Sequence, residues 1–319
     1  MRFQKCLAIA VVFLYLRSGF AQLDQISSTT HQQATESALS DLRRKAETGD
    51  VSAQYLLGNL YVNGSSVKRD YKEAARLYSA AAARGSASAQ FMLGYLYEHG
   101  MGVGQDHSQA AKQYRAAAKQ GHAIAANNLA NLYQHGRGVR KDLDQAIEWY
   151  RLSAEHGDTT AQCNLASLYF LGREVPRNYQ EAARWFRAAA ELEFPVAQSN
   201  LAVMYYTGTG VPRDYKQAAE WTRRAAEQGY VIAKTDLGFL YEQGKGVPLD
   251  YVRAYMWYSL GVAGDDRRAS RQLKELSKLM SPKQLANAKE LVTYGKQYWG
   301  KREDFPGVEM SGVSFLPSH

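Results

Sequence analysis

Glycines alternate in the stretch HGMGVGQD, residues 99–106, a spacing that in some proteins lets the backbone wrap around a phosphate group. A phosphate-binding loop needs a β-strand before the glycines and a helix after them. The residues before this stretch, AQFMLGYLY, have the apolar spacing of a helix, and related loops elsewhere in the chain keep only the first glycine. The stretch therefore predicts a helix end with positive φ and no nucleotide site.

Other side chains that could bind a metal or catalyse a reaction are sparse. His99 and His135 occupy equivalent places 36 residues apart, too far for one zinc ion without a third ligand between them. No Ser–His–Asp or Cys–His arrangement is recognisable. Cys163 is expected to be a small buried side chain. The sequence thus predicts no catalytic residue, no metal and no cofactor.

A step of 36 residues organises the middle of the chain into six copies, from residue 49 to residue 264. Constant columns of alanine, leucine, tyrosine and glycine run through all six copies without any shift of register. They start at Ala53, Leu57, Tyr61 and Gly64 in the first copy and end at Ala233, Leu237, Tyr241 and Gly244 in the sixth.

Each copy predicts two helices. In the first copy, one helix is expected over residues 51–63, where Ala53, Leu57 and Tyr61 share an apolar face. The second starts at Asp70, and Glu73 three residues later predicts a capping box, in which the two side chains satisfy the first free amides of the helix. A tryptophan column on the second helices is expected to fill the grooves between helix pairs: Trp149, Trp185, Trp221 and Trp257.

The ends of the chain differ from its middle. Residues 1–21 have a basic start, an apolar run and small residues before Gln22, which predicts a secretory signal peptide. Residues 34–48 place Ala38, Leu39, Leu42 and Ala46 on one face, which predicts a capping helix. Residues 265–299 are expected to form C-terminal capping helices, with Ser281, Pro282 and Gln284 starting the last one. The segments 22–33 and 300–319 are expected to be loose.

Charge and cysteine content narrow the function classes. The net charge is +8, and it falls to +5 without residues 1–21, because Arg2, Lys5 and Arg17 leave with no acid. This mild excess of positive charge is too small to indicate a protein that binds nucleic acid. Only Cys163 then remains, so no internal disulfide forms and stability must come from packing. After cleavage, no segment is expected to span a membrane stably.

The repeated pattern, A-x-x-x-L-G/A-x-L-Y-x-x-G-x-G-V followed by D-Y-x-x-A-x-x-W-Y and a closing glycine, resembles the Sel-one-like repeat (SLR) family, relatives of the tetratricopeptide repeat. The resemblance implies an all-α fold, a right-handed α-solenoid of six helix-turn-helix repeats with terminal capping helices, which binds other proteins or peptides. One branch of the family, linked to β-lactam binding or hydrolysis, carries a cysteine pair in each repeat. This sequence lacks those pairs, so that association does not carry over.

Positions that vary between copies are candidates for binding, because the core columns of a repeat array must stay constant. Three such positions flank the apolar face of each first helix, which we expect to line the concave side of the solenoid. A row of side-chain amides, termed the ladder, would clamp an extended peptide, or would instead bond to its own helices and shape the superhelix. The ladder consists of Asn128, Asn164 and Asn200. The candidate binding residues are Asn59, Asn63, Met92, Tyr95, His99, Asn128, Asn131, His135, Asn164, Asn200, Asp236 and Phe239.

The loops between the two helices carry cations that are expected to gather along one edge, as a solvated rim or as a ridge that meets an acidic partner. These cations are Lys68, Arg69, Arg137, Arg140, Lys141, Arg173, Arg177, Arg213 and Lys245. The sequence thus favours an exported, monomeric, non-enzymatic scaffold, periplasmic or extracellular if bacterial, that binds a protein or peptide. Two alternatives stay open: an enzyme such as a β-lactam or cell-wall hydrolase, and an adaptor in envelope polysaccharide export.

Overall fold

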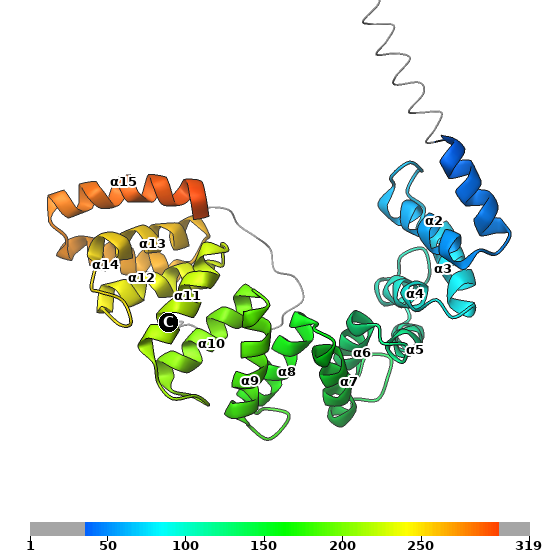
Figure 1. Ribbon diagram of the computed structural model, residues 1–319, viewed down its shortest axis with the longest axis horizontal. Coiled ribbons are helices and arrows are strands. Elements are labelled where there is room, and N and C mark those ends of the chain that lie inside the picture. Colours follow the sequence, from blue (N-terminus) through cyan, green and yellow to red (C-terminus); the bar gives the residue numbers. More distant parts are fainter. Residues whose placement is uncertain (1–35, 300–319) are drawn as a thin grey trace, which may run out of the picture. The chain divides into compact units, whose positions relative to one another are not determined.

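The computed structural model describes residues 36–299, with side chains placed up to residue 293. These residues form α-helices joined by loops, with no β-strand among them (Figure 1). Two compact units meet in sequence at Gln120 and Gly121. The predicted signal peptide, the segment 22–33 and the tail 300–319 lie outside the described residues. None of the described helices is both long enough and apolar enough to cross a bilayer.

The first unit holds a helix over residues 36–47 and two repeats. Each repeat consists of a first helix, termed the A helix, and a second, termed the B helix. The helices are α2 (Val51–Asn63), α3 (Tyr71–Ala83), α4 (Ala87–His99) and α5 (His107–Ala118). Consecutive helices pack side by side. In the capping helix Ala46 is buried beside Leu57. Ala38 was predicted on the same face but is exposed in the first described turn.

The second unit holds four further repeats and two capping helices. Its A and B helices alternate as α6 (Ala123–His135), α7 (Leu143–Glu155), α8 (Thr159–Leu171), α9 (Tyr179–Glu191), α10 (Pro195–Thr207), α11 (Tyr215–Glu227), α12 (Val231–Gln243) and α13 (Tyr251–Ala263). The capping helices α14 (Arg267–Leu279) and α15 (Pro282–Trp299) both pack on α13. The predicted all-α repeat architecture is therefore confirmed.

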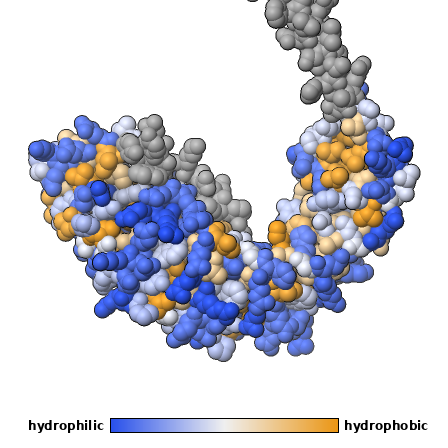
Figure 2. Space-filling view, viewed as in Figure 1, coloured by the Kyte–Doolittle hydropathy of each residue, from blue (hydrophilic) through white to orange (hydrophobic). Residues whose placement is uncertain are grey.

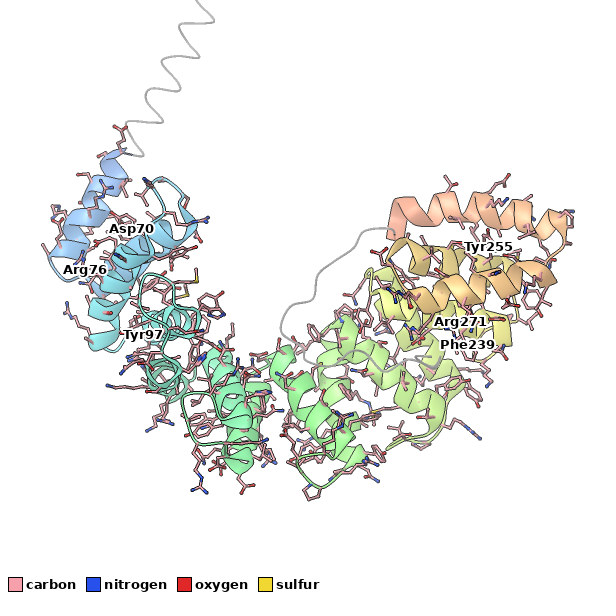
Figure 3. All side chains as sticks on the ribbon, turned by 180° about the vertical axis from the view of Figure 1, so that it is seen from behind. Asp70, Arg76, Tyr97, Phe239, Tyr255 and Arg271 are labelled. Carbon is pink, nitrogen blue, oxygen red and sulfur yellow. The ribbon has the colours of Figure 1, made fainter. Side chains whose placement is uncertain are left out.

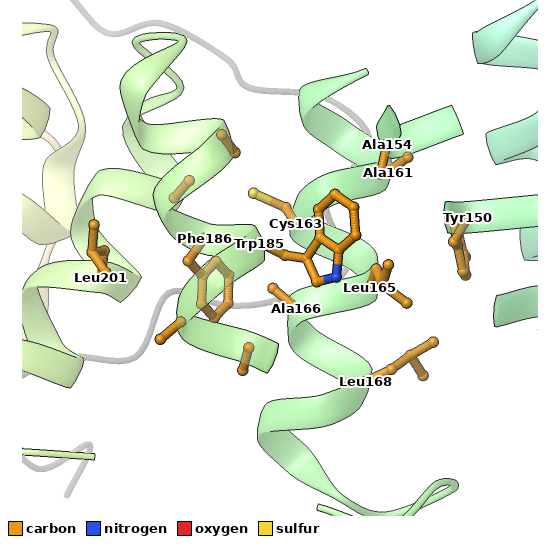
Figure 4. Close-up of a cluster of buried hydrophobic side chains, with 14 of the residues drawn as sticks. Tyr150, Ala154, Ala161, Cys163, Leu165, Ala166, Leu168, Trp185, Phe186 and Leu201 are labelled. Carbon is orange, nitrogen blue, oxygen red and sulfur yellow. The ribbon is translucent and has the colours of Figure 1, made fainter. Parts of the chain in front are cut away.

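The constant columns form the core of both units. The leucines from Leu57 to Leu237 are at most 4% exposed, and every alanine from Ala74 to Ala254 in the matching B-helix column is fully buried. Figure 4 shows one such cluster around Trp185 and Phe186 of α9, with Cys163 and Leu165 of α8. Trp185 and Trp257 thus belong to the core, as predicted, whereas Trp149 and Trp221 are partly buried and pack against it. Truncating one of these core leucines to alanine should lower the free energy of unfolding by about 2–5 kcal/mol.

A glycine or alanine always follows the core leucine of the A helix, because a B-helix side chain packs directly on its backbone. A Cβ added to Gly58 would lie 2.6 Å from the Tyr78 ring, and one added to Gly238 would lie 2.7 Å from the ring of Tyr258. Overpacking of this kind costs about 1–3 kcal/mol. The small residue therefore sets how closely the two helices of a repeat approach.

The helix ends follow the sequence signals, with one correction. The glycine after each A helix has φ between 59° and 73°, as predicted. Asp70 accepts hydrogen bonds from the amides of Lys72 and Glu73 at the start of α3. The reciprocal half of the predicted capping box is absent, because the Asp70 amide donates to the Tyr61 carbonyl of the A helix. Glu73 instead pairs with Arg76 at 2.6 Å, further along the same helix. Figure 3 labels Asp70 and Arg76.

A glutamine on the A helix links successive repeats, a feature that the sequence analysis did not find. The Gln54 side-chain amide donates to the Ala46 carbonyl at the end of the preceding helix. The same bond recurs from Gln90 to Ala82, from Gln162 to Ala154 and from Gln198 to Ala190. Each of these carbonyls also accepts the backbone amide three residues further on, so the glutamine adds a second hydrogen bond at the helix end.

Tyrosines on the B helices are matched to an acceptor on the A helix of the same repeat. The Tyr114 hydroxyl donates to Glu98, that of Tyr150 to Gln134 and that of Tyr258 to Glu242, at 2.6–3.0 Å. Where the B-helix residue is Phe186, the acceptor position holds Phe170, and the two rings meet edge to face. A buried hydroxyl needs such a partner. In the first repeat Val62 holds the acceptor position, and the Tyr78 hydroxyl donates to Asn59 instead.

Candidate binding face and pocket

Side chains of the first unit give its A helices a partly apolar surface. Leu56 on α2 is 51% exposed and Tyr95 on α4 is 37% exposed. Hydrophobic residues are visible over α2 in Figure 2. Tyr95 stacks on His99 with the ring centroids 4.1 Å apart, while Met92 packs against the core. Asn59 accepts a 2.6 Å hydrogen bond from the Tyr78 hydroxyl, and Asn63 is exposed.

The amides of α6 and α8 in the second unit form a connected set. The Asn164 Nδ2 donates to the Asn127 Oδ1 at 3.1 Å, and the Asn127 Nδ2 donates to Asn128 at 3.4 Å. Asn131 accepts from Arg137 in the following loop. Asn128 and Asn164 both remain half-buried. Asn164 thus bonds to a neighbouring helix, as the alternative interpretation of the ladder supposed, while its Oδ1 accepts no hydrogen bond from the described residues.

Two predicted binding residues lie inside the packed structure. Asn200 is 2% exposed, because α10 is buried along most of its length. Asp236 is 1% exposed and lies 4.0 Å from Arg268 of α14. The three-residue ladder is therefore not an open surface at Asn200, and Asp236 has a structural ion pair. Phe239 is half-buried, with its ring 6.1 Å from that of Tyr206.

The two histidines close the ends of their own helices. The Nδ1 of His99 lies 2.9 Å from the Tyr95 carbonyl, and that of His135 lies 2.9 Å from the Asn131 carbonyl. Because a carbonyl oxygen only accepts, each Nδ1 carries the hydrogen. The described residues contain no group of three or more histidine, cysteine, aspartate or glutamate side chains that could hold a metal ion.

Most of the loop cations are engaged within the chain. Arg69 and Arg177 donate to the last carbonyls of α2 and α8, and Lys245 donates to the Tyr206 hydroxyl at 2.8 Å. Lys141 pairs with Glu174 at 2.5 Å, and Arg213 lies over the Tyr215 ring. These bonds give the cations a local structural role. Lys68, Arg140 and Arg173 have no such partner among the described residues.

A pocket of about 380 Å³ opens between α6, α8 and the loop that follows α8. Leu168 and Leu171 give it an apolar wall, and Arg173 supplies an unpaired guanidinium. The Ser167 hydroxyl lines it and donates to the Cys163 carbonyl at 2.6 Å, so its lone pairs stay available. The full lining is Gln134, Asn164, Ser167, Leu168, Leu171, Arg173 and Glu174.

The loop after α8 differs from its equivalents at Glu174. The matching residues Gly102, Gly210 and Gly246 have positive φ and lie so close to the start of the preceding B helix that a Cβ would collide with its backbone. Glu174 does not have positive φ. Its carboxylate instead reaches back to Lys141 and to Gln134, 3.2 Å away. A glutamate here is incompatible with the close approach of the other loops, and the pocket lies beside it.

Charges in and near the pocket are set by these contacts. The hydrogen bond from Lys141 holds the pKa of Glu174 below its usual range, so this carboxylate is ionised and neutralised by its partner. Arg173 therefore leaves the pocket with one uncompensated positive charge. Cys163 is fully buried, as predicted, and burial raises the pKa of its thiol well above the usual value, which favours the protonated form.

Stacked helical hairpins with a constant core and a variable A-helix face define a helical repeat scaffold, a class typical of protein–protein interaction. The Sel1 repeat family matches residues 51–86, 87–122, 123–158, 159–194, 195–230 and 231–266, two residues later than the limits drawn from the sequence. The chain therefore belongs to the Sel1 repeat family. No curated protein matches the chain.

Solved structures of the same kind are similar to this chain. One is a protective antigen present in uropathogenic Escherichia coli strains, displaying an SLR fold, with 36% identity and a TM-score of 0.74. The match covers 82% of this chain and 56% of the antigen, so the chain spans little more than half of that protein's length. Another is a Sel1 repeat protein from Oxalobacter formigenes, with 33% identity and a TM-score of 0.58 over 67% of this chain and 85% of that one.

Proposed function

We propose that the chain is an exported, monomeric scaffold that binds a protein or peptide on its A-helix face, which we expect to be concave, and that it catalyses no reaction. The proposal is based on a difference between the core positions of the repeats and the positions beside them on the A helices. The core positions repeat six times, whereas the neighbouring A-helix positions change from copy to copy and leave Leu56, Tyr95, Asn128 and Asn164 accessible. Selection for packing alone would not require such variety at these A-helix positions.

We expect the A-helix face to lose its partner when its accessible side chains are truncated. Peptides selected from a display library on the purified chain would serve as probes. The combined variant Tyr95→Ala, Asn128→Ala and Asn164→Ala should bind them at least about tenfold more weakly, because it removes an exposed aromatic ring and two amides. Fluorescence anisotropy measures the affinity.

The matched control changes Lys112 and Lys216 to alanine on the exposed side of α5 and α11, where neither ammonium group has a partner among the described residues. This variant should bind like the parent chain. Equal loss in both variants, or none in the first, would remove the A-helix face as the binding surface. Turnover of a β-lactam or of cell wall material that survives both sets of changes would favour the enzymatic alternative instead.

The polysaccharide adaptor receives less support than peptide binding. An adaptor for an anionic polymer would use the row of loop cations, and most of these are engaged with helix carbonyls, a carboxylate or aromatic rings. An engaged cation gains less from a polymer phosphate or carboxylate, because its existing contact must be given up first.

We propose export through the N-terminal signal peptide, on the basis of the basic, apolar and small-residue pattern of residues 1–21. In a bacterial host, N-terminal sequencing of the protein from the periplasm or medium should give Gln22 as the first residue. Recovery of the chain in the cytosolic fraction with Met1 intact would contradict this proposal.

A further inference from the structure

The pocket between α6 and α8 has the features of a specific site. Its apolar wall, Leu168 and Leu171, comes from one side of α8, and the unpaired cation Arg173 follows directly in the loop. Most other loop cations lie against a carbonyl, a carboxylate or an aromatic ring, whereas Arg173 has no such contact among the described residues. A free guanidinium beside an apolar wall favours a carboxylate attached to a hydrophobic group.

Hydrogen-bond acceptors complete the lining. The Asn164 Oδ1 is free because the amide uses its Nδ2 to reach Asn127. The Ser167 Oγ donates to its own helix and keeps its lone pairs. Gln134 is fixed, since it accepts from Tyr150 and donates to Glu174. Two free acceptors next to one cation suit the backbone N–H groups of a peptide whose carboxylate pairs with Arg173.

We infer that this pocket binds a peptide in which a carboxylate lies next to an aliphatic side chain, and that Glu174 keeps the pocket open. The aliphatic side chain packs on Leu168 and Leu171, and the carboxylate pairs with Arg173. A volume of about 380 Å³ accommodates one such pair and not a long segment. This inference rests on the proposed function and assigns one pocket of that face to one kind of ligand.

Glu174 affects the pocket through the backbone conformation of the loop beside it. With glycine at this place the loop would have the freedom that the other repeats use to lie on the preceding B helix. Glutamate has a Cβ that would collide with the preceding B helix in the close approach of the other loops, and its carboxylate is bonded to Lys141 and to Gln134 in the pocket lining. Glu174→Gly should therefore let the loop close over the pocket.

The test uses the full chain and short defined peptides observed by NMR chemical-shift titration. Ac-Gly-Leu-Glu-Gly-NH2 is compared with its Leu-Gln and Ala-Glu counterparts, and Ac-Gly-Gly-Leu with a free carboxylate is compared with its amide. The two arms distinguish a side-chain carboxylate from a chain terminus. In at least one arm, the carboxylate peptide should bind about tenfold more tightly than its neutral counterpart, the gain that a charge-assisted hydrogen bond provides.

Variants locate the effect. Arg173→Gln should remove the preference for the carboxylate and leave binding of the neutral peptide unchanged, and Arg173→Lys should restore only part of it. Arg140→Gln, which removes an equally unpaired loop cation away from the pocket, should change neither. Glu174→Gly should weaken both peptides, with unchanged helix content by circular dichroism.

The inference fails if neither arm shows a preference for the carboxylate, or if Arg173→Gln and Arg140→Gln behave alike. Binding of the display-selected peptides separates the two proposals. If these peptides still depend on Tyr95 and Asn128 but not on Arg173, the A-helix face remains and the pocket assignment is wrong. If they depend neither on these three residues nor on Asn164, the proposed function fails as well.

Discussion

Replacing Gly246 by alanine is expected to destabilise the second unit by more than about 3 kcal/mol. Gly246 has φ of +73°, and an added Cβ would lie well inside contact distance of the Tyr215 carbonyl oxygen. The left-handed backbone alone costs about 1–2 kcal/mol for an alanine, and the collision forces the loop away from α11. Urea unfolding followed by circular dichroism measures the change in free energy of unfolding.

Gly157→Ala is the matched control for this prediction. Gly157 also has positive φ, +84°, but an added Cβ would meet no atom within 4 Å. Only the cost of the backbone conformation should appear, about 1–2 kcal/mol. If the two variants lose the same free energy, the close approach of the loop to the preceding B helix contributes nothing, and the account of Glu174 loses its basis.

Replacing Arg268 by alanine is expected to cost about 3 kcal/mol in the same measurement. Arg268 on α14 pairs with Asp266 at 2.7 Å and with the buried Asp236 at 4.0 Å. Removing one member of a buried ion pair leaves a charge without that partner in a medium of low dielectric constant. The control is Lys278→Ala on the same helix, whose pair with Glu275 is exposed on both sides and should be worth less than about 1 kcal/mol.

The Arg268 network also predicts a dependence on pH. Burial pushes the pKa of Asp266 up, but hydrogen bonds from Arg268 and Thr235 outweigh it, so the pKa in the folded chain lies below the usual value. The stability that this carboxylate contributes is present above its unfolded pKa of about 3.9 and is lost as pH falls through the lower folded pKa. Arg268→Ala should therefore reduce the acid sensitivity of unfolding below about pH 4. If the free energy of unfolding falls as steeply below pH 4 in the variant as in the parent chain, this assignment is wrong.

The fold could be predicted from the sequence because each repeat carries the same signals six times. The limits of α2, the glycine at its end and the cap at Asp70 all match the structure. Glu193 has φ of 60° at the place where four other B helices are followed by Gly85, Gly121, Gly157 or Gly229. In a single copy such signals would be ambiguous. A residue type that recurs at the same position in all six copies indicates a packing role, because chance does not produce such a column.

The site could be predicted only in part, because its contacts join residues distant in sequence. Variation marked Asn128, Asn164 and Asn200 alike, yet Asn200 is buried, and no periodicity distinguishes it from the other two. In the sequence Glu174 differs from most of the equivalent loop positions only by not being glycine, and its bonds to Lys141 and Gln134 depend on the folded loop. The glutamine links between repeats were missed for the same reason.

The matched tyrosine and acceptor positions bear on how the array can change in length. Gain or loss of a whole 36-residue hairpin keeps every tyrosine with its acceptor, because both lie within one repeat. A crossover inside a hairpin would join, for example, Phe170 of one copy to Tyr258 of another and leave the hydroxyl without its carboxylate. Genetic recombination in such genes is therefore expected to preserve the hairpin as its smallest exchangeable piece.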